Sequence, residues 1–322
     1  MKKIIVWMYR NDNGDQPLLK LTALLKAHGM QVFCDFDMGA CHVLNGEVFT
    51  SCGVNLSGFD CLYHMNADEQ TDHQADILRA ISDSNVSVIN DCRSYFYCQD
   101  KFRTNNLLRR SGFCVPDAML LAKGVGRPLI DRVFKRWRAL LVKPRTGHGA
   151  KGIIKFTDPE QFYDWLEGAC GDTSSVYIER FVEFADKDFR VEVFNGEVLG
   201  GYSRRRKHSY KTNISSGGEM TPANIRPYAD LAVSAAKVLG VTGTVIDMVD
   251  GTIDGRTYIL EVNPLLGIFV ESAMMAGTKM IPKKAHPSYA YDDKKIEKIA
   301  HYIISCVSTK NDEFSSDSSH HD

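Results

Sequence analysis

A glycine-rich segment between two apolar runs is the feature that most restricts the fold of this chain. Residues 140–156 read LLVKPRTGHGAKGIIKF, with glycines at positions 147, 149 and 152 in a G-x-G-x-x-G pattern. In a dinucleotide-binding Rossmann fold this pattern lies between a strand and the first turn of a helix. Here the residues that follow, 153–156, are branched and aromatic and predict a second strand. The pattern therefore predicts a strand–loop–strand flap and argues against a Rossmann fold.

Two interpretations of this flap are open. A glycine-rich hairpin can be only a tight turn, and the glycine spacing alone favours that interpretation. A glycine flap can also close over phosphates, because glycine lets the backbone approach a ligand and adopt positive φ. Lys143 and Pro144 directly precede the flap. Together with the acidic strands further along the chain, they favour the phosphate-binding interpretation.

The composition permits two or three domains and argues against several classes of protein. The chain has 322 residues and a formal net charge of −1, which is too nearly neutral for a dedicated nucleic-acid binder. Its nine cysteines form no C-x-x-C pair and predict reduced thiols in a cytoplasmic protein. No apolar run approaches the length of a membrane span. We therefore expect neither nucleic acid nor a membrane as a partner.

The first hundred residues alternate strand and helix. Strands are expected over residues 4–8, 32–36, 59–63 and 86–89, with helices that end at Gly29 and that span residues 74–81. This order predicts a small α/β domain with a parallel sheet. No phosphate loop is found in it. After residue 187 the pattern changes to strands joined by hairpin turns, which predicts an antiparallel sheet.

Two later strands carry acidic residues in apolar surroundings. They are expected over residues 244–249 and 257–262, joined by turns that contain Asp-Gly. Alternation of side chains places Asp247 on one face of the first strand and Glu261 and Asn263 on one face of the second. A lone buried carboxylate is costly, whereas two carboxylates and an amide oxygen suit Mg²⁺ bound together with nucleotide phosphates. The alternative is one solvent-facing and one ion-paired carboxylate; the D…E-x-N pattern favours the metal site.

A basic loop, RRRKHSYK, occupies residues 204–211. Such a run is usually a solvated face, and a nucleic-acid patch is a second interpretation that lacks an aromatic platform. The third is a loop that handles the anions of ATP and of a carboxylate substrate. Arg204 directly follows a predicted strand, so its position is fixed and it is the first candidate. His208 is interpreted as a surface histidine.

Taken in order, these segments resemble the ATP-grasp superfamily, and most closely its RimK-type amino-acid ligases. The resemblance covers most of residues 99–268. It implies an α/β (α+β) fold with a parallel-sheet domain (1–97), a central lid subdomain with the flap (98–180) and a C-terminal antiparallel subdomain with the metal site (181–308). The remaining residues, 309–322, are rich in Ser, Asp and His with almost nothing to bury and predict a disordered tail. The resemblance also implies an enzyme of the ligase class. It leaves open whether the chain forms a homo-oligomer.

The family's roles transfer to the matching positions. The resemblance implies that Lys101 and Lys143 contact phosphates and that Arg204 lies beside the transferred phosphoryl group, with Arg204 and Lys143 as the catalytic candidates. Asp247, Glu261 and Asn263 match the ligands of two Mg²⁺ ions, for which Mn²⁺ could substitute. The remaining nucleotide-binding positions lie in the flap, in the hinge between subdomains, at the ribose and in the loop after the basic run: Gly147, His148, Gly149, Gly152, Glu179, Arg180, Phe181, Val182, Asp188, Lys211 and Asn213.

The resemblance implies the ATP-dependent joining of a carboxylate to an amine, through an acyl phosphate, with release of ADP and phosphate. An amino acid or a peptide is the expected substrate. The chain departs from related ligases at Pro264-Leu265-Leu266-Gly267, where small or polar residues are usual, and at residues 280–293, which do not correspond to a segment of the resemblance. Two alternatives stay open: a small-molecule kinase of the same fold and a non-catalytic ATP-binding regulatory module.

Overall fold

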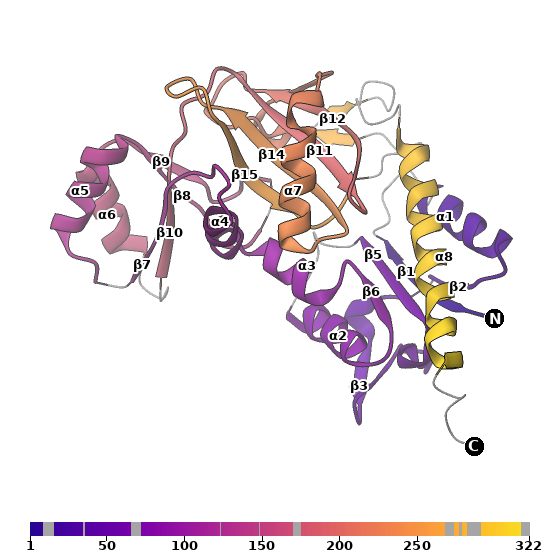
Figure 1. The fold of residues 1–322 in the computed structure, drawn as a ribbon. Helices are drawn as coiled ribbons and strands as arrows, with labels where there is room; N and C mark the ends of the chain where they lie inside the picture. The colour runs from indigo at the N-terminus through magenta and orange to yellow at the C-terminus, as the bar shows by residue number, and fades with distance from the viewer. Residues whose placement is uncertain are drawn as a thin grey trace.

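The protein consists of a parallel-sheet domain, two antiparallel sheets and a long C-terminal helix (Figure 1). A computed structural model describes this arrangement. The described residues are 1–8, 16–34, 36–65, 72–122, 124–147, 149–169, 175–267, 274–276, 279–281 and 291–316.

The N-terminal domain is built on a parallel sheet with the strand order β2-β1-β5-β6. The strands β1 and β5 are buried along almost their whole length, which explains their continuous apolar sequences. The predicted parallel α/β domain is confirmed. Its elements are β1 (Lys3–Met8), α1 (Gln16–Ala27), β2 (Gln31–Phe33), η1 (Met38–Ala40), β3 (His42–Leu44), β4 (Glu47–Phe49), η2 (Leu56–Gly58), β5 (Cys61–Met65), α2 (Asp72–Asp83), β6 (Ser87–Ile89) and α3 (Cys92–Gln99).

The middle of the chain forms an antiparallel sheet with the order β7-β10-β8-β9. Two helices pack on it through an aromatic cluster around Phe162. The second of these begins at Pro159, and Asp158 caps it by accepting a hydrogen bond from Glu160 N at 2.9 Å. The elements are α4 (Lys101–Arg110), β7 (Ala118–Ala122), α5 (Arg127–Trp137), β8 (Leu140–Val142), β9 (Ile154–Phe156), α6 (Pro159–Ala169) and β10 (Ser175–Arg180). The glycine flap joins β8 to β9, so the predicted strand–loop–strand is confirmed.

A second antiparallel sheet has the order β13-β12-β11-β14-β15. Its apolar face carries Val191, Val193 and Ile246 and packs on the alanine-rich face of α7. Because side chains alternate along a strand, the opposite face carries Asp188, Arg190 and the other polar residues of the same strands. The elements are β11 (Lys187–Phe194), β12 (Glu197–Arg205), η3 (Ile214–Ser216), β13 (Glu219–Thr221), η4 (Arg226–Tyr228), α7 (Ala229–Leu239), β14 (Gly243–Asp250) and β15 (Thr257–Asn263).

The C-terminal helix α8 (Asp292–Ser316) returns to the N-terminal domain and lies beside α1 and β5 (Figure 1). Its buried residues Ile299 and Ile303 share one core cluster with Leu21 and Leu25 of α1. The sequence analysis grouped this segment with the C-terminal subdomain and expected a disordered tail from residue 309. The helix instead continues to Ser316, because its first half is fixed by packing on the N-terminal domain; two short strands, β16 (Met274–Ala276) and β17 (Lys279–Ile281), precede it.

Two further expectations concerned reduced cysteines and the lack of a membrane span. Among the described residues, eight cysteines are free thiols. Within the same residues, no helix has the length and apolar character that crossing a membrane requires.

A buried histidine joins the N-terminal sheet to the segment that follows it. His64 on β5 is 1% exposed, and its Nε2 lies 3.0 Å from the backbone oxygen of Asn90. Its ring packs edge-on against Tyr95. Burial lowers the pKa of His64 to about 4.

We predict that His64 makes the fold sensitive to acid. Its folded pKa of about 4 lies below the ordinary 6.5, so its contribution to stability is complete above 6.5 and is lost as the pH falls toward 4. Between about pH 7 and about pH 4.5 this amounts to roughly 2–3 kcal/mol of unfolding free energy. Urea unfolding of wild type and His64→Gln at both pH values measures it. The exposed His28→Gln is the control, and equal pH slopes in all three proteins would show that His64 does not contribute.

Candidate active site

A cleft of about 900 Å³, which includes the open space at its mouth, lies between the two antiparallel sheets. It is lined by β8 and the flap on one side, by β11, β12, β14 and β15 on the other, and by the first residue of α4. Six cationic and four acidic side chains line it, which gives an excess of positive charge suited to an anionic ligand. They are Lys101, Lys143, Lys151, Arg180, Arg204 and Lys211, with Glu179, Asp188, Asp247 and Glu261.

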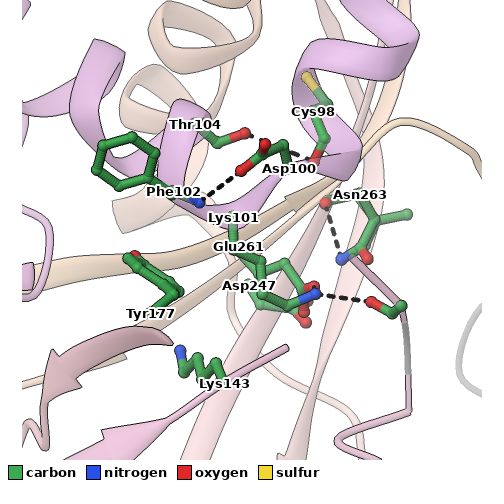
Figure 2. Close-up of polar contacts among 12 residues, drawn as sticks. Cys98, Asp100, Lys101, Phe102, Thr104, Lys143, Tyr177, Asp247, Glu261 and Asn263 are labelled. Carbon is green, nitrogen blue, oxygen red and sulfur yellow. Dashed lines mark hydrogen bonds and ion pairs between the residues drawn. The ribbon is translucent and has the colours of Figure 1, made fainter. Parts of the chain in front are cut away.

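The two acidic strands bring their carboxylates together as the sequence predicted. Asp247 on β14 and Glu261 on β15 are direct partners in the antiparallel register, and both line the cleft. Figure 2 shows them side by side with the end of Lys101, whose Nζ lies 2.9 Å from Glu261 Oε1. Asn263 is opposite Val245, two residues beyond Glu261 on β15. Its amide nitrogen lies 3.5 Å from Val245 O, and it does not line the cleft.

A chain of alternating charges crosses the polar face of the second sheet. Arg204 on β12 donates to both carboxylate oxygens of Asp188, at 3.0 and 2.5 Å, and to Asp247 Oδ2 at 3.0 Å. Arg190 Nε lies 2.9 Å from Asp247 Oδ1, and Thr212 donates to Asp188 at 2.6 Å. Burial opposes the charge on Arg204, but Asp247 and Asp188 outweigh burial and raise its pKa. Arg204 is therefore a fixed cation, and the expected ribose acid Asp188 is held by two donors.

A second charged pair is buried under the flap. Lys143 Nζ lies 2.5 Å from Glu179 Oε2, and both side chains are less than a tenth exposed. Tyr177 donates to the other oxygen of Glu179 at 2.6 Å. Burial and the Glu179 carboxylate raise the pKa of Tyr177, so it is a neutral donor. Glu179 thus holds the amino group of Lys143 at the wall of the cleft (Figure 2 shows Lys143 and Tyr177).

The expected hinge, residues 179–182, joins the two antiparallel sheets. It lies at the end of β10, and all four side chains line the cleft. Phe181 N donates to Ala139 O at 3.0 Å, and the Lys155 ammonium lies 3.6 Å from the centroid of the Phe181 ring. Arg180 donates to Tyr258 at 2.8 Å. These contacts hold the hinge against the residue that precedes β8 and against β15.

The flap is held over the cleft by side chains from outside it. Lys101 Nζ donates to Gly147 O at 2.6 Å, Lys211 Nζ to Ala150 O at 3.1 Å, and Tyr210 to Ile153 O at 3.0 Å. The expected glycines 147, 149 and 152 all have positive φ, as a flap of this shape requires. A Cβ at Gly152 would lie 2.8 Å from Pro144. His148 lies outside the described residues.

The sequence analysis missed several residues that the structure places at the site. Arg190 pairs with Asp247, and Tyr210 holds the flap. Arg190 stands two residues after Asp188 on a predicted strand, so alternation could have assigned it to the polar face. Tyr210 lies in an irregular loop, where no periodic signal exists. The apolar lining residues were also not named: Leu141, Ile153, Phe184, Val249 and Leu260.

The residues present fit magnesium bound together with a nucleotide. Asp247 Oδ1 is buried and faces Arg190 Nε at 2.9 Å without accepting a well-aligned hydrogen bond from the described residues, and Glu261 lies beside it. In the described part of the chain, no three His, Cys, Asp or Glu side chains gather as a metal site. Mg²⁺ is commonly bound by one or two carboxylates plus substrate phosphates, and this arrangement matches that pattern.

Comparison with known proteins agrees with this geometry. The RimK-like ATP-grasp domain matches residues 98–282, more than half of the chain. The chain therefore belongs to the RimK-like ATP-grasp family. It is an ATP-dependent ligase that forms a carbon–nitrogen bond between a carboxylate and an amine, and the predicted class of enzyme is confirmed.

Individual relatives are distant. A tetrahydromethanopterin:alpha-L-glutamate ligase from Methanosarcina acetivorans is 26% identical over 63% of this chain and 67% of its own length. A probable alpha-L-glutamate ligase from Legionella pneumophila is 24% identical over 84% of this chain and 91% of its own length. The structure of the ATP-grasp ligase PsnB with minimal precursor, Mg and ADP aligns with a TM-score of 0.58 at 18% identity, over 94% of this chain and 98% of that one. At this identity the structural likeness shows the fold, and the predicted ATP-grasp fold is confirmed.

We predict that Tyr210→Phe loosens the flap. The change removes the hydrogen bond to Ile153 O, a loss of roughly 0.5–1.5 kcal/mol, and so raises the population of the open flap several-fold. Hydrogen exchange of the amides between residues 149 and 153 measures this opening. Tyr302→Phe on α8 is the control, because it lies outside the cleft. Unchanged exchange in Tyr210→Phe would show that the tyrosine does not hold the flap.

Proposed function

We propose that this ligase joins an amino acid, or a residue of a peptide, to a second amino acid through an acyl phosphate formed from ATP in the cleft. The observation that supports it most directly is the register pairing of Asp247 with Glu261 at the base of a cleft whose lining is positively charged. Two carboxylates beside four lysines suit a metal-bound triphosphate and suit few other ligands.

We assign phosphate binding to the lysines that surround the cleft. Lys101, Lys143 and Lys211 now bond to carbonyl or carboxylate oxygens, at 2.6, 2.5 and 3.1 Å. Each can exchange that partner for a phosphate oxygen, because an ammonium presents three donors. Asn213 lines the same end of the cleft and is assigned to the nucleotide or the substrate. The flap would cover the triphosphate and keep water from the acyl phosphate.

We assign the metal to Asp247, Glu261 and Asn263. The first two line the cleft, and Asn263 follows Glu261 by two residues on β15. Magnesium bound there would neutralise the negative charge that develops on the transferring phosphoryl group. Arg204 adds a cation whose position is fixed by Asp188 and Asp247. A preorganised cation in a closed site stabilises developing charge without reorganisation. Arg204 would thus stabilise the phosphoryl group while the substrate carboxylate attacks it.

The substrate class rests on the relatives. The two curated relatives described above are named as glutamate ligases, and the PsnB structure holds a precursor. We therefore take L-glutamate as the first amino acid to test, on either side of the new bond. A peptide acceptor is the second substrate to test.

The proposal is tested by measuring phosphate release with ATP, Mg²⁺ and pairs of amino acids or short peptides, followed by the mass of the product. The expected product has the summed mass of two substrates less one water. A stable phosphorylated product without an amine would instead assign the chain to the kinases. ATP binding without ADP release from any pair would contradict a catalytic role.

We predict that Glu261→Ala abolishes product formation and leaves the fold intact. The side chain is about one quarter exposed and pairs only with Lys101 among the described residues, so its loss removes a metal ligand at little cost in packing. Activity is measured by ADP release at saturating ATP and Mg²⁺, and the fold by circular dichroism. Glu183→Ala, on the hinge side, is the control. Normal turnover in Glu261→Ala would remove this residue from the metal site.

We predict that Arg204→Lys lowers kcat at least 100-fold and changes the KM for ATP only a few-fold. Lysine keeps the charge but cannot bond two oxygens of Asp188 and one of Asp247 at once. Losing one preorganised donor typically costs about 10²–10³ in kcat. Steady-state kinetics compare this variant with Arg205→Lys, whose side chain is half exposed and pairs with Asp186. A raised KM with unchanged kcat would assign Arg204 to binding alone.

A further inference from the structure

The segment 264–267, directly after the proposed metal ligand Asn263, connects the second antiparallel sheet to the rest of the protein. Leu266 is 4% exposed and belongs to the core cluster shared by the N-terminal sheet and α8. Leu265 packs on the other side of that sheet, against a separate cluster around Ile5 and Leu62. The two leucines, which depart from the residues usual in related ligases, therefore dock this segment on the N-terminal domain.

Asn90, at the end of the N-terminal sheet, bonds to both acidic strands. Its side-chain nitrogen donates to Gly243 O at 2.8 Å and also to Pro264 O, and its side-chain oxygen accepts from Gly243 N at 2.7 Å. Gly243 is the first residue of β14, and Pro264 follows the last residue of β15. One carboxamide, 4% exposed, thus joins the ends of the two strands that carry Asp247, Glu261 and Asn263.

Lys295, on the first turn of α8, bonds to the other end of the segment. Its Nζ donates to Gly267 O at 2.7 Å and lies 2.6 Å from Glu192 and 2.9 Å from Asp292. The side chain is fully buried, and two carboxylates compensate its charge. Glu192 is two residues from Arg190 on the same face of β11, so Lys295 also closes the row of charges that ends at Asp247.

Asn90 and Lys295 both lie outside residues 98–282, the part of the chain that matches the ATP-grasp family. We propose that they are positioning residues for the metal site: they fix the backbone on either side of Pro264-Leu265-Leu266-Gly267 and thereby hold Asn263 and Asp247 in place. The proposal rests on the metal assignment made above. It makes metal binding depend on the N-terminal domain and on α8, whose described residues contribute no side chain to the lining of the cleft.

The contacts of Asn90 act on the metal ligands through the ends of β14 and β15. Thr244, next to Gly243, donates to Asn263 O at 2.7 Å, and Asn263 bonds in turn to Val245. Freeing Gly243 and Pro264 would let this end of the strand pair shift, which moves the ligands without removing them. Substitution of residues that orient metal ligands typically costs 10- to 100-fold in metal affinity.

The test measures Mn²⁺ binding by the EPR signal of the free ion, in the presence of a non-hydrolysable ATP analogue. We expect Asn90→Ala to raise the Mn²⁺ dissociation constant at least tenfold, while the affinity for the analogue without metal stays within twofold. The control is Asn55→Ala, which removes the side-chain N-cap of the short helix η2 in the same domain. This change should lower stability without changing Mn²⁺ binding. If Asn90→Ala does not fold, Asn90→Asp serves instead, because it keeps the acceptor for Gly243 N and loses both donated bonds.

Lys295 is tested in the same way. Lys295→Met alone removes the cation that pairs with both Glu192 and Asp292, so it is combined with Glu192→Gln and Asp292→Asn. The control is Lys298→Met, a partly exposed lysine on the same helix that pairs with Glu197. Weakened Mn²⁺ binding in the triple variant supports the proposal. Wild-type Mn²⁺ binding in folded Asn90 and Lys295 variants would overturn it, whereas failure of the wild type to bind Mn²⁺ with the analogue would overturn the metal assignment itself.

Discussion

The buried row of charges from Asp188 through Arg204 and Asp247 to Arg190 is the interaction on which the site depends. Arg204 lies between the carboxylates of Asp188 and Asp247, and Asp247 also pairs with Arg190. Removing one member would leave its partner buried and uncompensated, at a cost of roughly 3–5 kcal/mol. The row therefore fixes β11, β12 and β14 relative to one another and places two cations next to the proposed metal position. The same contacts that hold the sheet together also prepare its charge for a phosphoryl group.

Charge balance also governs the lysines that line the cleft. Lys101, Lys143 and Lys211 bond to flap carbonyls or to Glu179 and Glu261, so each of these three ammonium groups has an oxygen partner. A triphosphate with its metal offers these groups equivalent oxygens. Binding would then exchange one set of partners for another, which costs less than desolvating free ammonium groups. The flap and the loop after Arg205 would adjust together, because Tyr210, Lys211 and Ser215 join them.

Much of this arrangement is predictable from the sequence, and the reasons are local. The glycines between two strands, the Asp-Gly turns and the D…E-x-N pattern predicted the flap, the hairpin and the register of Asp247 with Glu261, because each depends on alternation or on turn chemistry. The ion pairs of Arg204 and Arg190 were not predicted, since they depend on which strands become neighbours in the sheet. Asn90 and Lys295 gave no signal either. Their partners lie 153 and 28 residues away along the chain, and nothing in the local pattern of an asparagine after a strand or a lysine on a helix indicates such a contact.

The return of α8 to the N-terminal domain has a consequence for synthesis on the ribosome. The first domain lacks one wall of its core until Ile296, Ile299, Ile303 and Val307 have been translated. A nascent chain that has completed the parallel sheet and both antiparallel sheets would still expose the apolar side of α1. Closure of this core thus joins contacts almost 300 residues apart in sequence, a topology associated with slow folding and with exposure to chaperones. Helix α8, which leaves the exit tunnel after both antiparallel sheets, is the element that seals the N-terminal domain.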